Sequence, residues 1–240
     1  MFSLDKRLIA LAMFTAVVSA TVTSALMTGG IVRDSSHFSW YAARASGMVA
    51  YLLATMSVLF GLATSTQLGQ RMLGKANVAD VHRVLSLLTL FAIGGHTMFL
   101  ALDQYASFGL SDLLIPFITW YRPVWTGFGI LAAYLTFALY LSFGIRSIIG
   151  YRAWRAFHYA AFAVFALGTM HGLFAGTDTS AAWALAIYVS AAVAVSCMLA
   201  YRILRWIRLV DLQSGDQNAV APSRRLSRAV SMGGPKFSRR

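Results

Sequence analysis

Six long apolar stretches follow one another along the chain, separated by shorter polar segments. Each is long enough for a helix of about 20 residues, which is what the hydrocarbon core of a bilayer requires. None shows the strict alternation of apolar and polar positions that is typical of a half-buried strand. The pattern therefore predicts an all-α, polytopic membrane protein, a bundle of six transmembrane helices. The predicted spans are residues 8–27, 40–63, 81–102, 124–145, 157–175 and 181–204.

The first stretch, within residues 1–29, has two interpretations. Lys6 and Arg7 precede it, and small residues such as Ser19 and Ala20 stand near its end, as in a secretory signal peptide. Its apolar run is longer than the core of a typical signal peptide, which favours an uncleaved first transmembrane anchor. Either interpretation leaves the topology of the main domain, residues 30–209, unchanged.

The connection between the third and fourth spans, residues 103–123, is unusually apolar for a loop and too short to cross the membrane and return as helices. It predicts an interfacial or partly re-entrant segment that covers one end of the bundle. Aromatic side chains at its end are typical of the membrane–water interface. The connection holds Leu113, Leu114, Ile115, Phe117, Trp120 and Tyr121, and the interfacial aromatic residues are Trp120, Tyr121 and Trp125, which begins the next span.

Composition agrees with a membrane protein and adds an orientation. The chain is 58% hydrophobic and 12% charged, with a net charge of +12. Cationic residues gather on one side of the predicted spans, which indicates membrane topology rather than binding of nucleic acid. With the N-terminus inside, seventeen of the 20 Lys and Arg residues lie on the inner side. The three on the outer side are Arg33, Arg44 and Arg122.

Two further features of the sequence have simple interpretations. Residues 210–240 are polar, basic and rich in serine, without apolar periodicity, and predict a disordered cytoplasmic tail. Adhesion of this tail to anionic lipid headgroups is the alternative to a purely solvated segment. The single cysteine, Cys197, lies in the last span, where a small packing residue is the simplest interpretation.

Four of the five histidines lie inside the apolar stretches, two on the third span and two on the fifth. An imidazole in hydrocarbon is costly unless it binds something, so an intramembrane histidine is a candidate functional residue. Fourteen residues separate His82 from His96, a helical rise of about 21 Å, and thirteen separate His158 from His171, about 19.5 Å. Both spans run in the same direction, which sets His82 level with His158 and His96 level with His171.

Two levels of paired histidines match the axial ligands of two haems, one in each leaflet. A single histidine in a span is often a hydrogen-bonding packing residue, but four at matched levels favour ligation. One zinc ion cannot collect ligands from levels about 20 Å apart. An ideal helix returns to within about 40° of the same face after fourteen residues but lies about 140° away after thirteen. We therefore expect a distortion of the fifth span, with Gly168 as its site.

Haem propionates need cations, and three arginines are candidates. Arg155 precedes His158 by one turn on the same helical face, and Arg83 follows His82 directly. Arg44, near the outer end of the second span, is the best outer candidate. Its alternative is an arginine that extends along the helix to the interface.

The histidines and their surroundings resemble the ferric reductase-like transmembrane domain family. This family includes the haem cores of NADPH oxidases and ferric-chelate reductases and the bacterial haem subunit of the methionine sulfoxide reductase system. The resemblance covers about residues 40–204, and the spaced histidine pairs are its most specific part. The matching stretches are YAARASGMVAY (41–51), VHR to GH (81–96), WRAFH (154–158) and MHGLFAGTD (170–178).

The resemblance implies that His82, His96, His158 and His171 bind the iron of two b-type haems and that Arg44 contacts a propionate. It implies transmembrane electron transfer to an acceptor on the outer face, such as ferric ion, oxygen or a redox protein. The oxidases carry a flavin and nicotinamide domain after the sixth span that this sequence lacks. We therefore expect electrons from a separate flavoprotein or from membrane quinol, and an oxidoreductase component that depends on such a partner.

A non-catalytic haem-binding sensor, or an assembly subunit of a membrane complex, is the alternative function. A transporter is disfavoured because the spans hold no clear acidic residue at mid-depth. The expected location is the inner or plasma membrane, with lipid around the bundle and both termini in the cytoplasm.

Overall fold

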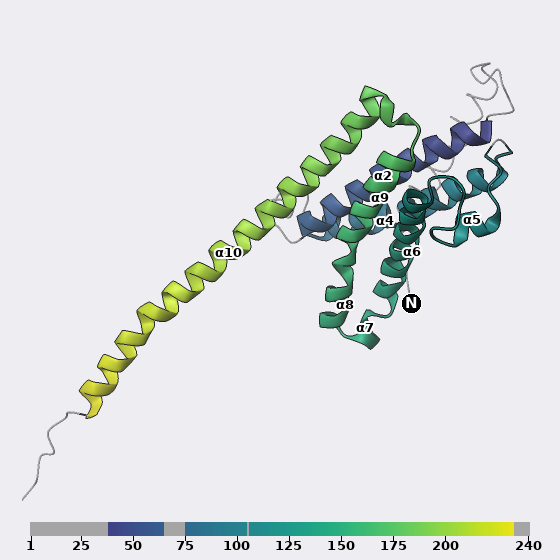
Figure 1. Ribbon diagram of the computed structural model, residues 1–240. Helices are drawn as coiled ribbons and strands as arrows, with labels where there is room; N and C mark the ends of the chain where they lie inside the picture. The colour runs from purple at the N-terminus through teal and green to yellow at the C-terminus, as the bar shows by residue number, and fades with distance from the viewer. Residues whose placement is uncertain (1–37, 65–74, 105, 233–240) are drawn as a thin grey trace, which may run out of the picture. The chain divides into compact units, whose positions relative to one another are not determined.

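The computed structural model describes residues 38–64, 75–104 and 106–232. Side chains are described for residues 38–64, 78–104 and 106–208. Within these residues all regular secondary structure is helical (Figure 1). The elements are α2 (Phe38–Thr64), α4 (Lys75–Leu102), α5 (Leu110–Leu114), α6 (Pro123–Gly144), α7 (Arg146–Ile149), α8 (Tyr151–His158), α9 (Ala160–Ala175), the 3-10 turn η2 (Asp178–Ser180) and α10 (Ala182–Met232).

Five helical segments are long and apolar enough to cross a membrane. They confirm the second to sixth predicted spans, with ends that differ by a few residues. The first predicted span, residues 8–27, lies outside the described residues. The chain is a multi-pass membrane protein. A helix suits this location because in lipid it satisfies every backbone hydrogen bond internally. The five segments are Phe38–Thr64, Val78–Leu102, Pro123–Gly144, Tyr151–Ala175 and Ala182–Arg208.

Four helices form a closed ring of neighbours around a common centre. α2 packs against α4, α4 against α6, α6 against α9, and α9 against α2. The contacts of Gly61 with His82 and of Gly47 with His96 make α2 and α4 antiparallel. α4 and α9 stand at opposite corners of this ring, so side chains from these two helices can meet only across its centre.

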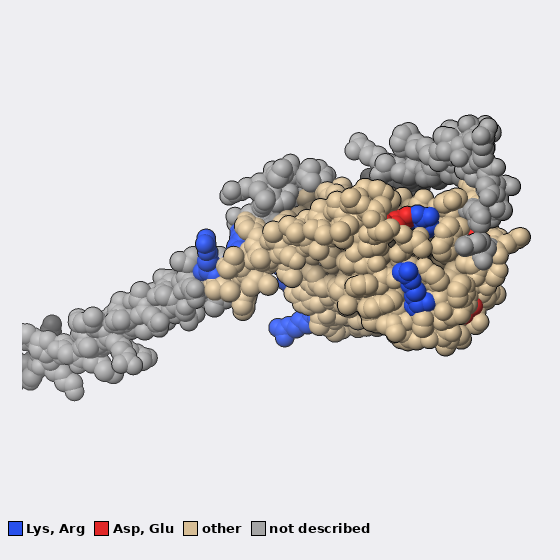
Figure 2. Space-filling model, turned by 45° about the horizontal axis from the view of Figure 1, so that its top comes forward, with Lys and Arg blue, Asp and Glu red and all other residues tan. Residues whose placement is uncertain are grey.

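The surface of the described part is apolar. Buried residues are mostly small, whereas large apolar side chains such as Phe91 (68% exposed) and Val193 (56%) face outward. The face shown in Figure 2 is largely uncharged, with few basic or acidic side chains. An apolar surface of this extent is the reverse of a water-soluble protein and indicates contact with lipid.

The fifth span is distorted, but not at the position that the sequence predicts. The helix is interrupted at Tyr159, between α8 and α9, whereas Gly168 lies inside the regular part of α9. The backbone amide of Tyr159 donates to the carbonyl of Ala156 (3.3 Å), and the carbonyl of Tyr159 accepts from the amide of Phe162 (3.1 Å). Both bonds span three residues, as in a 3-10 turn. Each residue of such a turn rotates by about 120° instead of about 100°, which brings His171 back toward the face of His158.

The connection after α4 is compact and exposes apolar side chains. Asp103 is buried and accepts a hydrogen bond from the amide of Ala106 (2.6 Å), which fixes the turn that leaves α4. Pro123 begins α6 at a position where the missing amide hydrogen costs nothing. The exposed side chains between these points agree with an apolar connection that lies at an interface. They are Leu110, Leu114, Ile115, Phe117, Ile118 and Trp120.

The chain divides into one unit that ends at Val195 and a second that begins at Ser196. α10 is continuous in sequence through both, and its backbone remains helical as far as Met232. Residues 210–232, where the sequence predicts a disordered tail, therefore have helical backbone. A helix satisfies its backbone hydrogen bonds locally, so helical backbone can continue past the apolar stretch.

Candidate functional site

The four histidines of the spans meet as two pairs inside the ring of helices. His82 of α4 lies opposite His158 of α8, with ring centroids 6.1 Å apart and an interplanar angle of 85°. His96 of α4 lies opposite His171 of α9, at 6.2 Å and 77°. We call these the first pair and the second pair. The structure thus brings together the residues that the sequence sets at equal depth.

The separation of the rings fits a metal ion between them. Two metal–imidazole bonds of about 2 Å, plus about 1 Å from each nitrogen to its ring centre, set two trans imidazole centroids about 6 Å apart. Both pairs show this separation. Edge-to-face ring pairs such as Phe38 and Phe99 (6.2 Å, 90°) have it as well, so the distance agrees with a shared ion without requiring one.

Three of the four imidazoles are held through Nδ1 by a backbone carbonyl of the neighbouring helix. A carbonyl oxygen only accepts, so Nδ1 carries the proton and donates it. This tautomer leaves the lone pair of Nε2 free, which is the arrangement typical of metal-binding histidines. The contacts are His82 to Ser57 at 2.8 Å, His96 to Ala43 at 2.7 Å and His171 to Trp125 at 2.9 Å.

Glycines make these short approaches possible. A Cβ atom on Gly47 would stand 2.9 Å from Nδ1 of His96, and one on Gly129 would stand 2.5 Å from Nδ1 of His171. A Cβ on Gly61 would stand 3.2 Å from Cε1 of His82. At Gly47 and Gly129 a Cβ would force the imidazole to move, whereas at Gly61 a shift of a few tenths of an ångström would accommodate it.

Sequence reasoning missed these glycines, although a signal was present. Gly47 and Gly61 are fourteen residues apart on α2, the same spacing as His82 and His96 on the antiparallel α4. A helix that carries two ligands at this spacing requires small residues at the same spacing on the helix it packs against. Gly129 has no such partner in the sequence, and only the packing of α6 on α9 identifies it.

His158 differs from the other three histidines. Its Nδ1 is buried and has no hydrogen-bond partner in the described part of the chain. Instead the ring stacks on Trp154, one turn earlier on α8, with centroids 5.0 Å apart at 26°. The first pair is therefore held by the contacts of His82 with the carbonyl (2.8 Å) and hydroxyl (3.2 Å) of Ser57 and by one stacking contact. The second pair is held by two hydrogen bonds to backbone carbonyls.

An aromatic cluster lies along the same bundle. Tyr51 of α2 stacks on Phe165 of α9 (6.1 Å, 23°) and contacts Tyr188 of α10 (4.8 Å). The Tyr51 hydroxyl is 3.1 Å from Oγ1 of Thr169, one turn after Phe165. Phe165 falls between His158 and His171 in sequence, so this packing fixes the segment of α9 that separates the two pairs.

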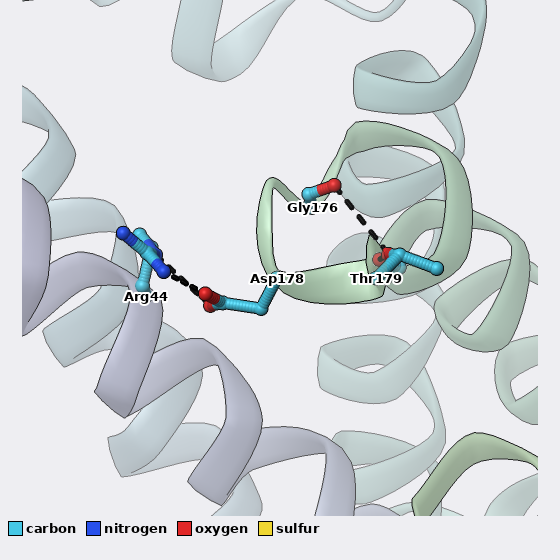
Figure 3. A network of polar contacts seen from close by, with 5 residues as sticks. Arg44, Gly176, Asp178 and Thr179 are labelled. Atoms are coloured by element: carbon cyan, nitrogen blue, oxygen red, sulfur yellow. Dashed lines mark hydrogen bonds and ion pairs between the residues drawn. The ribbon is translucent and has the colours of Figure 1, made fainter. Parts of the chain in front are cut away.

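Arg44 is engaged by a carboxylate that sequence reasoning did not assign to it. Its Nε donates to Asp178 at 2.9 Å, and a second guanidinium nitrogen pairs with the other carboxylate oxygen (Figure 3). Thr179 donates to carbonyls at the end of α9, including those of Leu173 (2.9 Å) and Gly176 (3.4 Å), and so holds the turn that presents Asp178. The contact with a propionate that the sequence predicts for Arg44 stays a prediction.

The two other candidate arginines lie toward the first pair but are largely exposed. Arg83 stands 5.6 Å from the ring of Phe143 and 3.8 Å from a carboxylate oxygen of Asp80. Arg155 is 3.5 Å from the hydroxyl of Tyr151. Neither is tied to a buried acidic partner in these contacts, so both retain donors for an anion.

The donor set defines the kind of cofactor that fits. Among the described residues, no group of three or more His, Cys, Asp or Glu side chains can hold a metal ion. If an ion lay between the two imidazoles of a pair, a cofactor would have to supply its remaining ligands. The residues present fit haem, whose macrocycle supplies four nitrogens and leaves two axial positions for protein ligands.

Comparison of the chain with protein-family models, curated protein sequences and solved structures found no match.

Proposed function

We propose that the first and second pairs are the axial ligands of two b-type haems, and that the protein carries electrons across the membrane between them. The observation that supports this most strongly is the pairing itself. In each pair, a ring from α4 faces a ring from α8 or α9 across the bundle, with about 6 Å between the ring centroids. For His82, His96 and His171, the Nδ1 contacts with backbone carbonyls favour the tautomer that ligation requires.

The direction follows from the charges in the sequence. The excess of Lys and Arg sets the first pair toward the inner side and the second pair toward the outer side. Bound haem would supply one-electron chemistry at each level, and the protein sets its ligation, depth and surrounding charge. On the inner side, Arg83 and Arg155 retain donors for propionates. On the outer side, Arg44 has donors beyond the two that Asp178 occupies.

The partners follow from the same arrangement. Input at the first pair requires a donor on the inner side, which we propose to be a separate flavoprotein or membrane quinol. Output at the second pair requires an acceptor on the outer face. The alternative function, a haem-binding sensor or assembly subunit, uses the same ligands without net transfer.

Proteoliposomes separate these two functions. We expect vesicles that contain the purified protein and trapped ferricyanide to lose the ferricyanide absorbance when dithionite is added outside. Reduction should be much faster than in protein-free vesicles. A variant with both His82→Ala and His158→Ala should fall to the protein-free rate, because one of the two levels is lost. Wild-type vesicles at the protein-free rate, with both haems present in their spectrum, would instead favour the sensor or assembly function.

A further inference from the structure

A second candidate site adjoins the second pair. It is a cavity of about 580 Å³, within the range of about 300–1,000 Å³ typical of small-molecule sites. α2, the connection after α4 and the turn after α9 each contribute to its walls. The lining residues are Trp40, Arg44, Ala106, Trp120, Tyr121 and Thr177.

Backbone contacts link the cavity to the second pair. Ala43, whose carbonyl holds Nδ1 of His96, directly precedes Arg44 in the cavity wall. On the opposite side, the hydroxyl of Tyr121 donates to the carbonyl of Ala175 (3.1 Å), one turn after His171. The wall of the cavity is therefore continuous with Ala43, which holds His96, and with the end of α9, the helix that carries His171.

The aromatic walls favour a flat ligand. Trp40 and Tyr121 meet edge to face, with centroids 6.4 Å apart at 87°. Trp120 meets Tyr121 edge to face, with ring centroids 5.6 Å apart at 76°, and stacks on Phe108 with centroids 5.9 Å apart. Such walls offer ring faces and edges, and a planar conjugated molecule uses both.

The lining of the cavity carries little net charge. Arg44 is the only charged residue among those that line the cavity in the described part of the chain, and Asp178 neutralises it. An anionic metal chelate would have to compete with this carboxylate, and a free cation finds no unpaired carboxylate in the lining. The guanidinium still has donors beyond the two that Asp178 occupies, and they suit a carbonyl oxygen.

The rim of the cavity indicates how such a ligand arrives. Trp120 is 65% exposed and Ile118, two residues earlier, is 53% exposed. Both belong to the apolar connection that the sequence predicts to lie at the membrane interface. A molecule dissolved in the bilayer therefore reaches the cavity over an apolar surface.

We propose that this cavity binds the neutral head group of a quinone, with a carbonyl oxygen bound by Arg44 and the ring held by Trp120, Trp40 and Tyr121. Binding itself is independent of the haems. Its role as an electron-exchanging ligand of the second pair rests on the proposed function.

Titration of decylubiquinone into the full chain in lipid nanodiscs, with empty nanodiscs subtracted, tests the proposal. We expect Trp120→Leu and Ala106→Leu each to weaken binding about tenfold, because the first removes a ring contact and the second fills the cavity. Trp120 is 65% exposed, so its replacement by leucine leaves no buried cavity. Trp206→Leu, an equally exposed tryptophan on α10 (66%), is the matched control and should bind as the wild type does.

Three results would overturn the proposal: no binding beyond empty nanodiscs, equal affinity of both cavity variants and the control, or tighter binding of ferric citrate than of the quinone. The haem absorbance of the same samples separates this inference from the proposed function. Full haem absorbance without quinone binding overturns only the cavity assignment. Quinone binding that depends on Trp120 in a protein that takes up no haem supports the cavity and contradicts the haem assignment.

Discussion

Replacement of His171 by alanine is expected to halve the haem content of the purified protein, from about two per chain to about one. His171 contributes the imidazole of α9 to the second pair, where it lies 6.2 Å from the ring of His96. The first pair uses α4 and α8 and should keep its ligand. Pyridine haemochrome absorbance, divided by the protein concentration, measures the ratio.

Met170→Leu is the control for this change, because it alters the neighbouring residue at nearly constant volume. Met170 is 41% exposed, and its variant should retain the full haem content. An unchanged haem content in the His171→Ala protein would contradict the pairing. Complete loss of haem in a protein that remains folded would show that the two levels do not bind independently.

Gly129→Ala is expected to disrupt the second pair almost as strongly, although it changes no ligand. The added Cβ would stand 2.5 Å from Nδ1 of His171, closer than van der Waals contact allows, so the ring must move. Movement breaks the hydrogen bond to the carbonyl of Trp125, a loss of about 1 kcal/mol, and turns Nε2 away from its partner. We expect loss or altered absorbance of one haem, with the other unchanged.

Helix propensity cannot explain such a result, because alanine is a better helix former than glycine by about 1 kcal/mol. Gly168→Ala supplies the matched control: it makes the same change on α9, at a site where a Cβ meets nothing within 4 Å. This variant should keep both haems and unfold at the same or a higher temperature. A Gly129→Ala spectrum identical to that of Gly168→Ala would show that the glycine does not position the imidazole.

The spans were predictable from sequence because hydropathy over about 20 residues is a strong local signal. The five that fall in the described residues, from Phe38–Thr64 to Ala182–Arg208, differ from expectation only at their ends. The levels of the histidines were also predictable, since they need only the helical rise and the order of the spans. Those two facts bring His82 opposite His158 and His96 opposite His171.

What the sequence did not reveal depends on contacts between distant segments. The break in the fifth span lies at Tyr159 and not at Gly168, because helical rotation shows that a distortion is needed but not where it occurs. Asp178 is 134 residues from Arg44, and neither residue indicates the other. The carbonyl that holds His171 belongs to Trp125 on α6, a contact that only the packing of two helices creates.

If each histidine pair holds one haem through both imidazoles, electron paramagnetic resonance of the oxidised, purified protein should show it. The two rings of each pair, 6.1 Å and 6.2 Å apart, would hold the iron from both sides. We expect two haems per chain, both with low-spin signals. A protein without haem, or one whose haems give only the high-spin signal of an iron with a single axial imidazole, would contradict it.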